Sequence, residues 1–111
     1  MQMTREERDG ITILRVRERR LTSSLAPELK TALLEAVTEG CANLLLDMRE
    51  VTYTDSSALS GLLFGKRQAE QAGGTLKVLT GEGHLLKMMT IAQLDRVIEI
   101  HASEDEALAS F

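Results

Sequence analysis

The sequence predicts a single α/β domain whose mixed β-sheet opens with a β-hairpin and carries its helices mainly on one face. Two observations support this prediction. The pair Asp9-Gly10 separates two short strand-type segments, which is a strong hairpin signal. The rest of the chain alternates short apolar segments with longer amphipathic ones, as right-handed βαβ units do. Because 111 residues leave room for one hydrophobic core, we expect residues 1–111 to form one domain.

The first two strands are expected at Met1 to Glu7 and at Ile11 to Arg17, on either side of the hairpin turn. Because successive side chains of a strand point to opposite faces, Leu14 and Val16 share one face of the second strand. The other face holds Ile11, Ile13, Arg15 and Arg17. We expect that face to be partly polar. The basic run of Arg15, Arg17, Arg19 and Arg20 can attract an anion, but Glu18 interrupts it and its spacing suits the end of a strand in solvent, so we expect its arginines to be solvated.

The first helix is expected from Ser24 or Leu25 through Glu39, where apolar residues recur at three- and four-residue spacing. Pro27 falls in its first turn, where the missing N–H costs little, and Gly40 supplies the stop. The segment Asn43 to Asp47 then contains three consecutive leucines, which is typical of a strand covered on both faces. We expect it to be the innermost strand of the sheet.

Three helices and two strands are expected in the second half of the chain. After a loop from Met48 to Thr54, a helix begins at Asp55 and runs to about Gln71, where Gly73-Gly74 ends it. The remaining elements are a strand at Thr75 to Leu79, a short helix at His84 to Ala92, a strand at Arg96 to His101 and a last helix capped by Ser103 with Glu106.

The composition argues against several classes of function. Thirteen basic and seventeen acidic residues give a net charge of −4, and only 3% of the residues are aromatic, so we expect no nucleic-acid partner. Cys41 is the single cysteine, so we expect neither a metal ion nor another cofactor. No segment comes close to the 18 consecutive apolar residues of a membrane-spanning helix. The first ten residues carry charges where a signal peptide has its apolar core. We therefore expect a cytoplasmic protein without membrane insertion.

The sequence also lacks the motifs of common enzymes. Ser56, His84 and Asp47 are the residue types of a hydrolase triad, but there is no G-x-S-x-G nucleophile elbow. The G-x-x-x-x-G-K-[ST] loop that binds nucleotide phosphates is missing. A receiver domain needs an acidic pair after its first strand and a lysine after its last, and neither is present. We therefore expect a protein without enzymatic activity.

Function is most readily placed at Asp47 to Ser57, where the carboxyl end of a strand meets the start of a helix. Asp55 is suited to cap that helix, because its carboxylate can accept the N–H groups of Ser57 or Ala58. Ser56 then occupies the first helical position, with its hydroxyl open to another protein. Helix capping alone also explains these residue types, so both interpretations remain open at this point.

The same helix carries a stripe of small residues at Ala58, Gly61 and Gly65. A glycine inside a helix destabilises it by roughly 1 kcal/mol relative to alanine, so a close contact should compensate. That contact is made either with the sheet beneath the helix or with the backbone of a partner protein.

The segment from Asp47 to Leu59, DMREVTYTDSSAL, resembles the signature of STAS domains, typified by bacterial anti-sigma factor antagonists: Asp-Leu-x-x-Val, three residues, then Asp-Ser-Ser-Gly-Leu. The spacing agrees throughout. The resemblance extends over the rest of the chain, from the opening strands to the Gly73-Gly74 turn and the segment Leu94 to Ile98. It implies one STAS domain over residues 1–111.

This resemblance implies a small switch that binds an anti-sigma factor of the histidine-kinase-like ATPase class and so frees a sigma factor. The partner phosphorylates a serine, which matches Ser56 here, and a PP2C-type phosphatase reverses the change. Ser57 is the less favoured acceptor. The partner-binding residues so implied are Asp55, Ser56 and Ser57, with Thr22 and Ser23 in the loop before the first helix.

Three features depart from the family pattern. Ala58 and Ser60 stand where glycine is frequent, and Arg20-Leu21-Thr22-Ser23 stands where Gly-x-Leu-Asp is often found. An alternative function is that of a STAS subunit in a membrane lipid-transport ATPase complex, where the serine contacts the ATPase and no kinase acts. Binding of a nucleotide or small ligand is a third hypothesis, supported only by the loop from Asp47 to Ser57.

Overall fold

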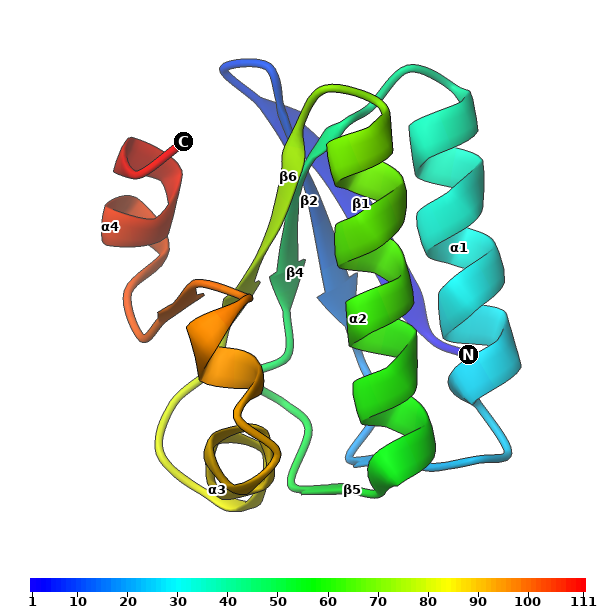
Figure 1. Ribbon diagram of the computed structural model, residues 1–111, viewed down its shortest axis with the longest axis vertical. Helices are drawn as coiled ribbons and strands as arrows, with labels where there is room; N and C mark the ends of the chain where they lie inside the picture. The colour runs from blue at the N-terminus through cyan, green and yellow to red at the C-terminus, as the bar shows by residue number, and fades with distance from the viewer.

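The computed structural model describes residues 1–111 and contains a five-stranded mixed sheet in the order β1-β2-β4-β6-β7 (Figure 1). β1 is antiparallel to β2, and the other neighbours are parallel. The strands are β1 (Met3–Arg8), β2 (Ile11–Val16), β4 (Asn43–Asp47), β6 (Thr75–Leu79) and β7 (Ile100–His101). The predicted mixed sheet, with its innermost strand at residues 43–47, is confirmed.

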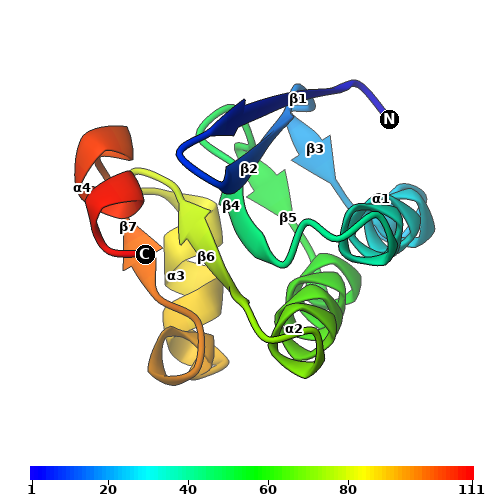
Figure 2. The ribbon, with the colours of Figure 1, turned by 90° about the horizontal axis from the view of Figure 1, so that it is seen from above.

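Two long helices cover one face of the sheet. They are α1 (Ala26–Thr38) and α2 (Ser56–Gln71), which lie side by side and run in the same direction (Figure 1). The short helix α4 (Glu104–Ala109) packs on the opposite face, and α3 (His84–Ile91) lies near the end at which the parallel strands finish (Figure 2). The helices are thus mainly on one face, as predicted. None of them has both the length and the apolar character needed to cross a membrane.

The hairpin turn between β1 and β2 has both central residues in the left-handed region, at φ 54° for Asp9 and 80° for Gly10. This is the backbone of a type I′ turn, whose twist matches that of the flanking strands. Arg8 pairs with Ile11 directly across the turn. The two-residue hairpin loop predicted from Asp9-Gly10 is therefore confirmed.

A second, two-stranded sheet lies where the sequence predicts only loops. β3 (Arg20–Leu21) pairs in parallel with β5 (Tyr53–Thr54), although residues 48–54 were expected to form a loop. A strand of two residues has no periodicity that a sequence can display. Because β3 precedes α1 and β5 precedes α2, this small sheet brings the starts of the two helices together.

The last strand is shorter than the predicted segment Arg96 to His101. Only Ile100 and His101 pair with β6, while Leu94–Arg96 forms a 3₁₀ turn entered through Gln93 at φ 61°. Ile98, which follows the turn, is buried in the main core. The chain therefore packs one side chain beneath the sheet before it joins the sheet edge.

The expectation that Arg15 lies in solvent is wrong. Every residue of β2 is buried, and Arg15 itself is only 9% exposed. Its guanidinium donates to Asp47 Oδ2 at 2.9 Å, to Glu6 Oε2 at 2.7 Å and to Glu104 Oε1 at 2.5 Å. Alternation within one strand cannot show that α4 folds over this face and supplies Glu104, which is why the arginine resembles a solvated residue in the sequence.

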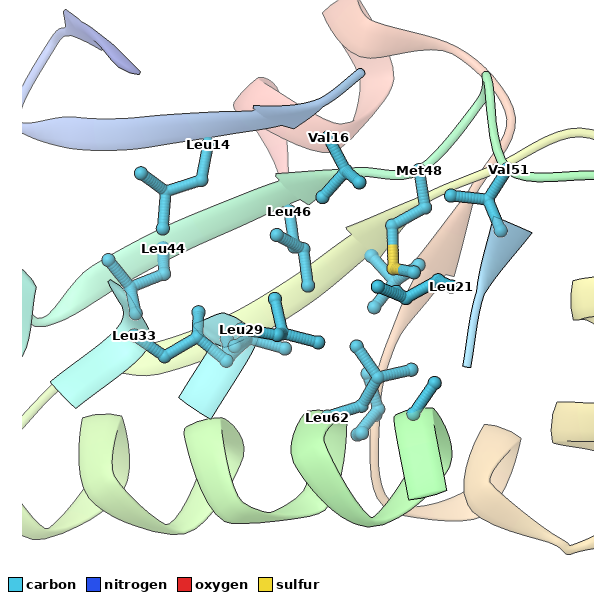
Figure 3. Packing of buried hydrophobic residues seen from close by; sticks show 14 of the residues in the cluster. Leu14, Val16, Leu21, Leu29, Leu33, Leu44, Leu46, Met48, Val51 and Leu62 are labelled. Atoms are coloured by element: carbon cyan, nitrogen blue, oxygen red, sulfur yellow. The ribbon is translucent and has the colours of Figure 1, made fainter. Parts of the chain in front are cut away.

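The main core lies between the sheet and the α1–α2 pair (Figure 3). Glycines allow α2 to approach α1 closely there. A Cβ on Gly61 would lie 3.3 Å from Leu29 Cδ2, and a Cβ on Gly65 would lie 2.6 Å from Leu33 Cδ1 and 3.0 Å from Leu76 Cδ1. The small-residue stripe is thus explained by packing inside the protein, against α1 as well as the sheet.

Candidate functional site

The amino end of α2 presents Ser56 to solvent. Asp55 is the N-cap, and its Oδ1 accepts hydrogen bonds from Ser57 N at 3.0 Å and Ala58 N at 3.3 Å. The cap therefore has the geometry predicted for Asp55. Ser56 is the first residue of the helix and is exposed, whereas Ser57 is half-buried, so Ser56 is the more accessible residue of the two.

The second oxygen of the same carboxylate fixes the loop before α1. Asp55 Oδ2 accepts a hydrogen bond from Ser23 N at 3.1 Å. The adjacent Thr54 is buried and donates from Oγ1 to Leu21 O at 2.9 Å. These bonds, with the β3–β5 pairing, hold Thr22 and Ser23 beside the start of α2. The structure thus brings the sequence-predicted residues Thr22, Ser23, Asp55, Ser56 and Ser57 into one region.

An open groove of about 530 Å³ lies between the amino-terminal halves of α1 and α2. Its lining holds four serines, one lysine and no carboxylate; the residues are Ser23, Ala26, Pro27, Lys30, Ser56, Ser57 and Ser60. Lys30 was not among the predicted site residues, because only the parallel alignment of α1 and α2 places it beside the serines. Its position in the sequence, within an amphipathic helix, carries no such signal.

A stack of three side chains borders the site on the side of β5. The Arg20 guanidinium lies 4.3 Å from the centroid of the Tyr53 ring, and Tyr53 is stacked on His84 with the centroids 4.8 Å apart and the planes inclined by 16°. His84 Nε2 also lies 2.9 Å from Thr54 O. Sequence reasoning missed this stack, which joins β3, β5 and α3 next to Asp55.

The residue types of a hydrolase triad do not form one. His84 bonds to the backbone of Thr54, and the Asp47 carboxylate is occupied by Arg15 and Arg49. Burial alone would raise the pKa of Asp47, but the hydrogen bonds from Arg49 and Arg15 outweigh it and hold that pKa below its usual value. Asp47 therefore belongs to the ion cluster beneath α4 and not to a site with Ser56.

The two departures within α2 have different consequences. Ala58 is completely buried, so its methyl group faces the core and leaves the surface of the site unchanged. Ser60 is exposed and lines the groove beside Ser56. Of these two residues, Ser60 is the one that alters what a partner would meet.

The fold is similar to those of solved anti-sigma factor antagonists. An anti-sigma factor antagonist from Mycobacterium paratuberculosis matches with a TM-score of 0.88 at 20% identity, covering 98% of this chain and 92% of that one. An anti-sigma-factor antagonist (STAS) domain protein from Planctomyces limnophilus matches with a TM-score of 0.81 at 14% identity, covering 97% and 95%. The Bacillus cell fate determinant SpoIIAA in its phosphorylated form matches with a TM-score of 0.73 at 17% identity, covering 98% of each. At such identities the likeness shows a shared fold.

The sequence itself matches the family described as "Mlab, STAS domain" over residues 3–100. This range includes the whole main sheet except the last residue of β7, together with α1, α2 and α3. It also includes the segment Asp47 to Leu59, which carries the signature. On the sequence match and the fold together, the chain belongs to the STAS domain family.

Proposed function

We propose that this protein is a phospho-regulated binding switch, an anti-sigma factor antagonist. When unphosphorylated it binds an anti-sigma factor serine kinase of the histidine-kinase-like ATPase class, and phosphorylation of Ser56 releases it. The observation that carries this proposal is the exposed Ser56 at the first position of α2, beside a carboxylate that is already engaged as the helix cap.

In the proposed switch, the antagonist supplies only the serine that accepts the phosphoryl group. The Ser56 hydroxyl oxygen attacks the γ-phosphorus of ATP bound to the kinase, the bond from that phosphorus to the β-phosphate oxygen breaks, ADP leaves, and the hydroxyl proton passes to a base of the kinase. A PP2C-type phosphatase restores the hydroxyl by hydrolysis. The antagonist supplies an accessible acceptor held by a rigid helix start, and its partner supplies the catalytic groups. Both steps are expected in the cytoplasm, where sigma factors act.

Phosphorylation should change binding far more than folding. A phosphoryl group adds roughly −1.5 to −2 charges, and a helix N-terminus stabilises a nearby anion by typically 0.3 to 1 kcal/mol. The domain should therefore keep its fold. Like charges brought together across an interface cost several kcal/mol, and about 1.4 kcal/mol corresponds to tenfold in affinity. Modification can thus dissociate the complex without rearranging the domain.

Phosphosite mapping tests the proposal. The protein is incubated with ATP and an anti-sigma factor serine kinase of the histidine-kinase-like ATPase class from the same organism, digested and analysed by mass spectrometry. We expect one phosphoryl group on Ser56 and none on a Ser56→Ala variant, with Ser60→Ala as the matched control that is still modified. Modification confined to other residues would overturn the assignment.

A second candidate function uses the same surface without a kinase, in a STAS subunit of a membrane lipid-transport ATPase complex. The observation that favours it is Ser60, whose side chain lines the groove beside Ser56 where the STAS signature often has glycine. Co-purification with a transporter ATPase, and a Ser56 that carries no phosphate in cells, would favour this candidate over the switch.

A further inference from the structure

The basic side chains around Ser56 have no acidic partners. Arg19 and Arg20 are exposed, Lys30 is half-buried, and none of the three forms an ion pair. Several other basic residues are paired, such as Arg17 with Glu50, Lys66 with Glu70 and Lys77 with Glu99, whereas Arg67, Lys87 and Arg96 are also without an ion pair but lie in other parts of the chain. We call Arg19, Arg20 and Lys30 the basic patch.

The members of the basic patch flank Ser56 on two sides. Arg20 lies over the ring of Tyr53, three residues before Ser56, and Arg19 O accepts the N–H of Tyr53 at 3.1 Å. Lys30 lies on the other side, in the lining of the groove that contains Ser56. The pairing of β3 with β5 and the packing of α1 on α2 thus bring three basic residues near Ser56. Arg19 is placed by its backbone, Arg20 by its contact with Tyr53, and Lys30 by the groove that it shares with Ser56, where its Nζ lies 6.0 Å from the centroid of the Phe64 ring.

Most acidic side chains near this end of the molecule are already engaged. The Asp55 carboxylate accepts three backbone N–H groups. Glu28 pairs with the N-terminal ammonium at 2.6 Å, Glu50 pairs with Arg17, and Glu18 accepts the N–H of Gln2. Glu82, beside the His84 loop, forms no ion pair. Three basic side chains without ion pairs therefore lie near Ser56, against the formal negative charge of Asp55 beside it, although the chain carries a net charge of −4.

The segment before α1 reinforces this charge. Where STAS domains often have Gly-x-Leu-Asp, this chain has Arg20-Leu21-Thr22-Ser23, so an acid is absent and an arginine is present. We propose that the basic patch docks an acidic segment of the partner, rich in aspartate and glutamate. This inference rests on the proposed function of the site. It adds the chemistry of the partner surface that would bind the basic patch.

The proposed docking also gives the phosphoryl group a specific target. Its charge of roughly −1.5 to −2 offsets most of the three positive charges of the patch, which removes the attraction for an acidic segment. The same modification would have no such effect on a partner held by apolar contacts alone. Charge neutralisation is then the physical basis of release.

The first experiment needs no kinase. The ¹⁵N-labelled protein is titrated at low salt with hexaglutamate and, separately, with hexalysine. We expect hexaglutamate to shift the amide signals of Arg20, Ser23, Lys30 and Ser56, to do so less at higher salt, and to lose this effect when phosphoserine is incorporated genetically at position 56. Equal shifts from hexalysine, or hexaglutamate shifts centred on another surface, would overturn the inference.

The second experiment uses the kinase and charge reversal. Arg20→Glu with Lys30→Glu should weaken kinase binding by more than tenfold, mainly through slower association. Arg67→Glu is the matched control, because Arg67 is exposed and unpaired on the carboxyl half of α2; it should bind within about twofold of the parent. Thermal unfolding of each variant establishes that it is folded, and Arg20→Gln with Lys30→Gln should give an intermediate affinity.

The two proposals fail in different ways. If Ser56 is phosphorylated and phosphorylation releases the kinase, yet the double charge reversal binds as tightly as Arg67→Glu, the basic patch does not dock the partner and the switch still stands. If Ser56 is never phosphorylated, the switch is lost, while the hexaglutamate titration still decides the charge preference of the surface.

Discussion

The Asp55 carboxylate joins two segments that lie 32 residues apart, because Oδ2 accepts the N–H of Ser23 while Oδ1 accepts those of Ser57 and Ala58. A helix cap usually stabilises only its own helix. Here the same side chain also fixes the loop that carries Thr22 and Ser23. The loop and the serine that would be phosphorylated are thus held in one arrangement by one carboxylate.

Asp55→Ala should therefore affect both segments. Loss of the cap should cost about 1 to 2 kcal/mol of unfolding free energy, measured by urea denaturation, and hydrogen exchange at the Ser23 amide should become faster. Ser103→Ala removes a cap that bonds one N–H, that of Glu106, and is the matched control. Unchanged exchange at Ser23 in Asp55→Ala would show that the carboxylate does not fix the loop.

Ser56→Asp should bind the kinase weakly and Ser56→Ala should keep the parental affinity, because only the aspartate adds negative charge beside the basic patch. The affinities are measured by isothermal titration calorimetry, with a loss of tenfold or more expected for aspartate, or about 1.4 kcal/mol. Gln71→Glu adds one negative charge at the exposed far end of α2 and should bind as the parent does. A Ser56→Asp variant of parental affinity would rule out charge at this position as the trigger.

The two buried glycines of α2 should respond differently to alanine. Gly65→Ala places a methyl group 2.6 Å from Leu33 Cδ1 and 3.0 Å from Leu76 Cδ1, and overpacking of this kind costs about 1 to 3 kcal/mol. Gly61→Ala makes one tight contact, with Leu29 Cδ2 at 3.3 Å, beside ordinary contacts with Lys30 Cγ at 3.8 Å and Leu29 Cγ at 3.9 Å, and gains up to about 1 kcal/mol of helix propensity. We expect Gly65→Ala to be clearly less stable than Gly61→Ala in chemical denaturation; equal stabilities would contradict the packing described for Gly65.

Acid should weaken the attachment of α4. Hydrogen bonds from Arg15 hold the pKa of Glu104 below its usual value. At Asp47, burial would raise the pKa, but the hydrogen bonds from Arg49 and Arg15 have the larger effect and lower it. A carboxyl group whose pKa falls on folding adds stability above its unfolded pKa, and that stability is lost as the pH drops through the folded pKa. The usual values are 4.5 and 3.8, so the loss should begin near pH 4.5 and continue below 3.8.

Glu104→Gln tests the source of that acid sensitivity. Thermal unfolding midpoints measured from pH 7 to pH 3 should be lower at neutral pH and should fall less steeply with acid than those of the parent. Glu35→Gln is the control, since Glu35 is exposed and forms no ion pair, and its curve should follow the parent's. A Glu104→Gln curve parallel to the parent's would exclude this carboxylate from the acid response.

The sequence carried the local features of the fold and of the site. Asp9-Gly10 specified a two-residue turn, because both positions adopt positive φ. The three leucines of residues 44–46 marked the central strand, and Asp55 marked the start of α2, because a carboxylate at that position accepts the first free N–H groups of a helix. Each of these signals depends on residues within a few positions of one another.

Tertiary structure decided the features that depend on distant segments. Arg15 is buried where β1, β4 and α4 bring Glu6, Asp47 and Glu104 to it, and Lys30 shares a groove with the serines because α1 packs beside α2. Arg20 lies over the Tyr53 ring because β3 pairs with β5, and these two-residue strands are too short to show side-chain alternation in the sequence. Side-chain alternation and capping are local properties of the chain, whereas the partners of a charge are set by which surfaces meet when it folds.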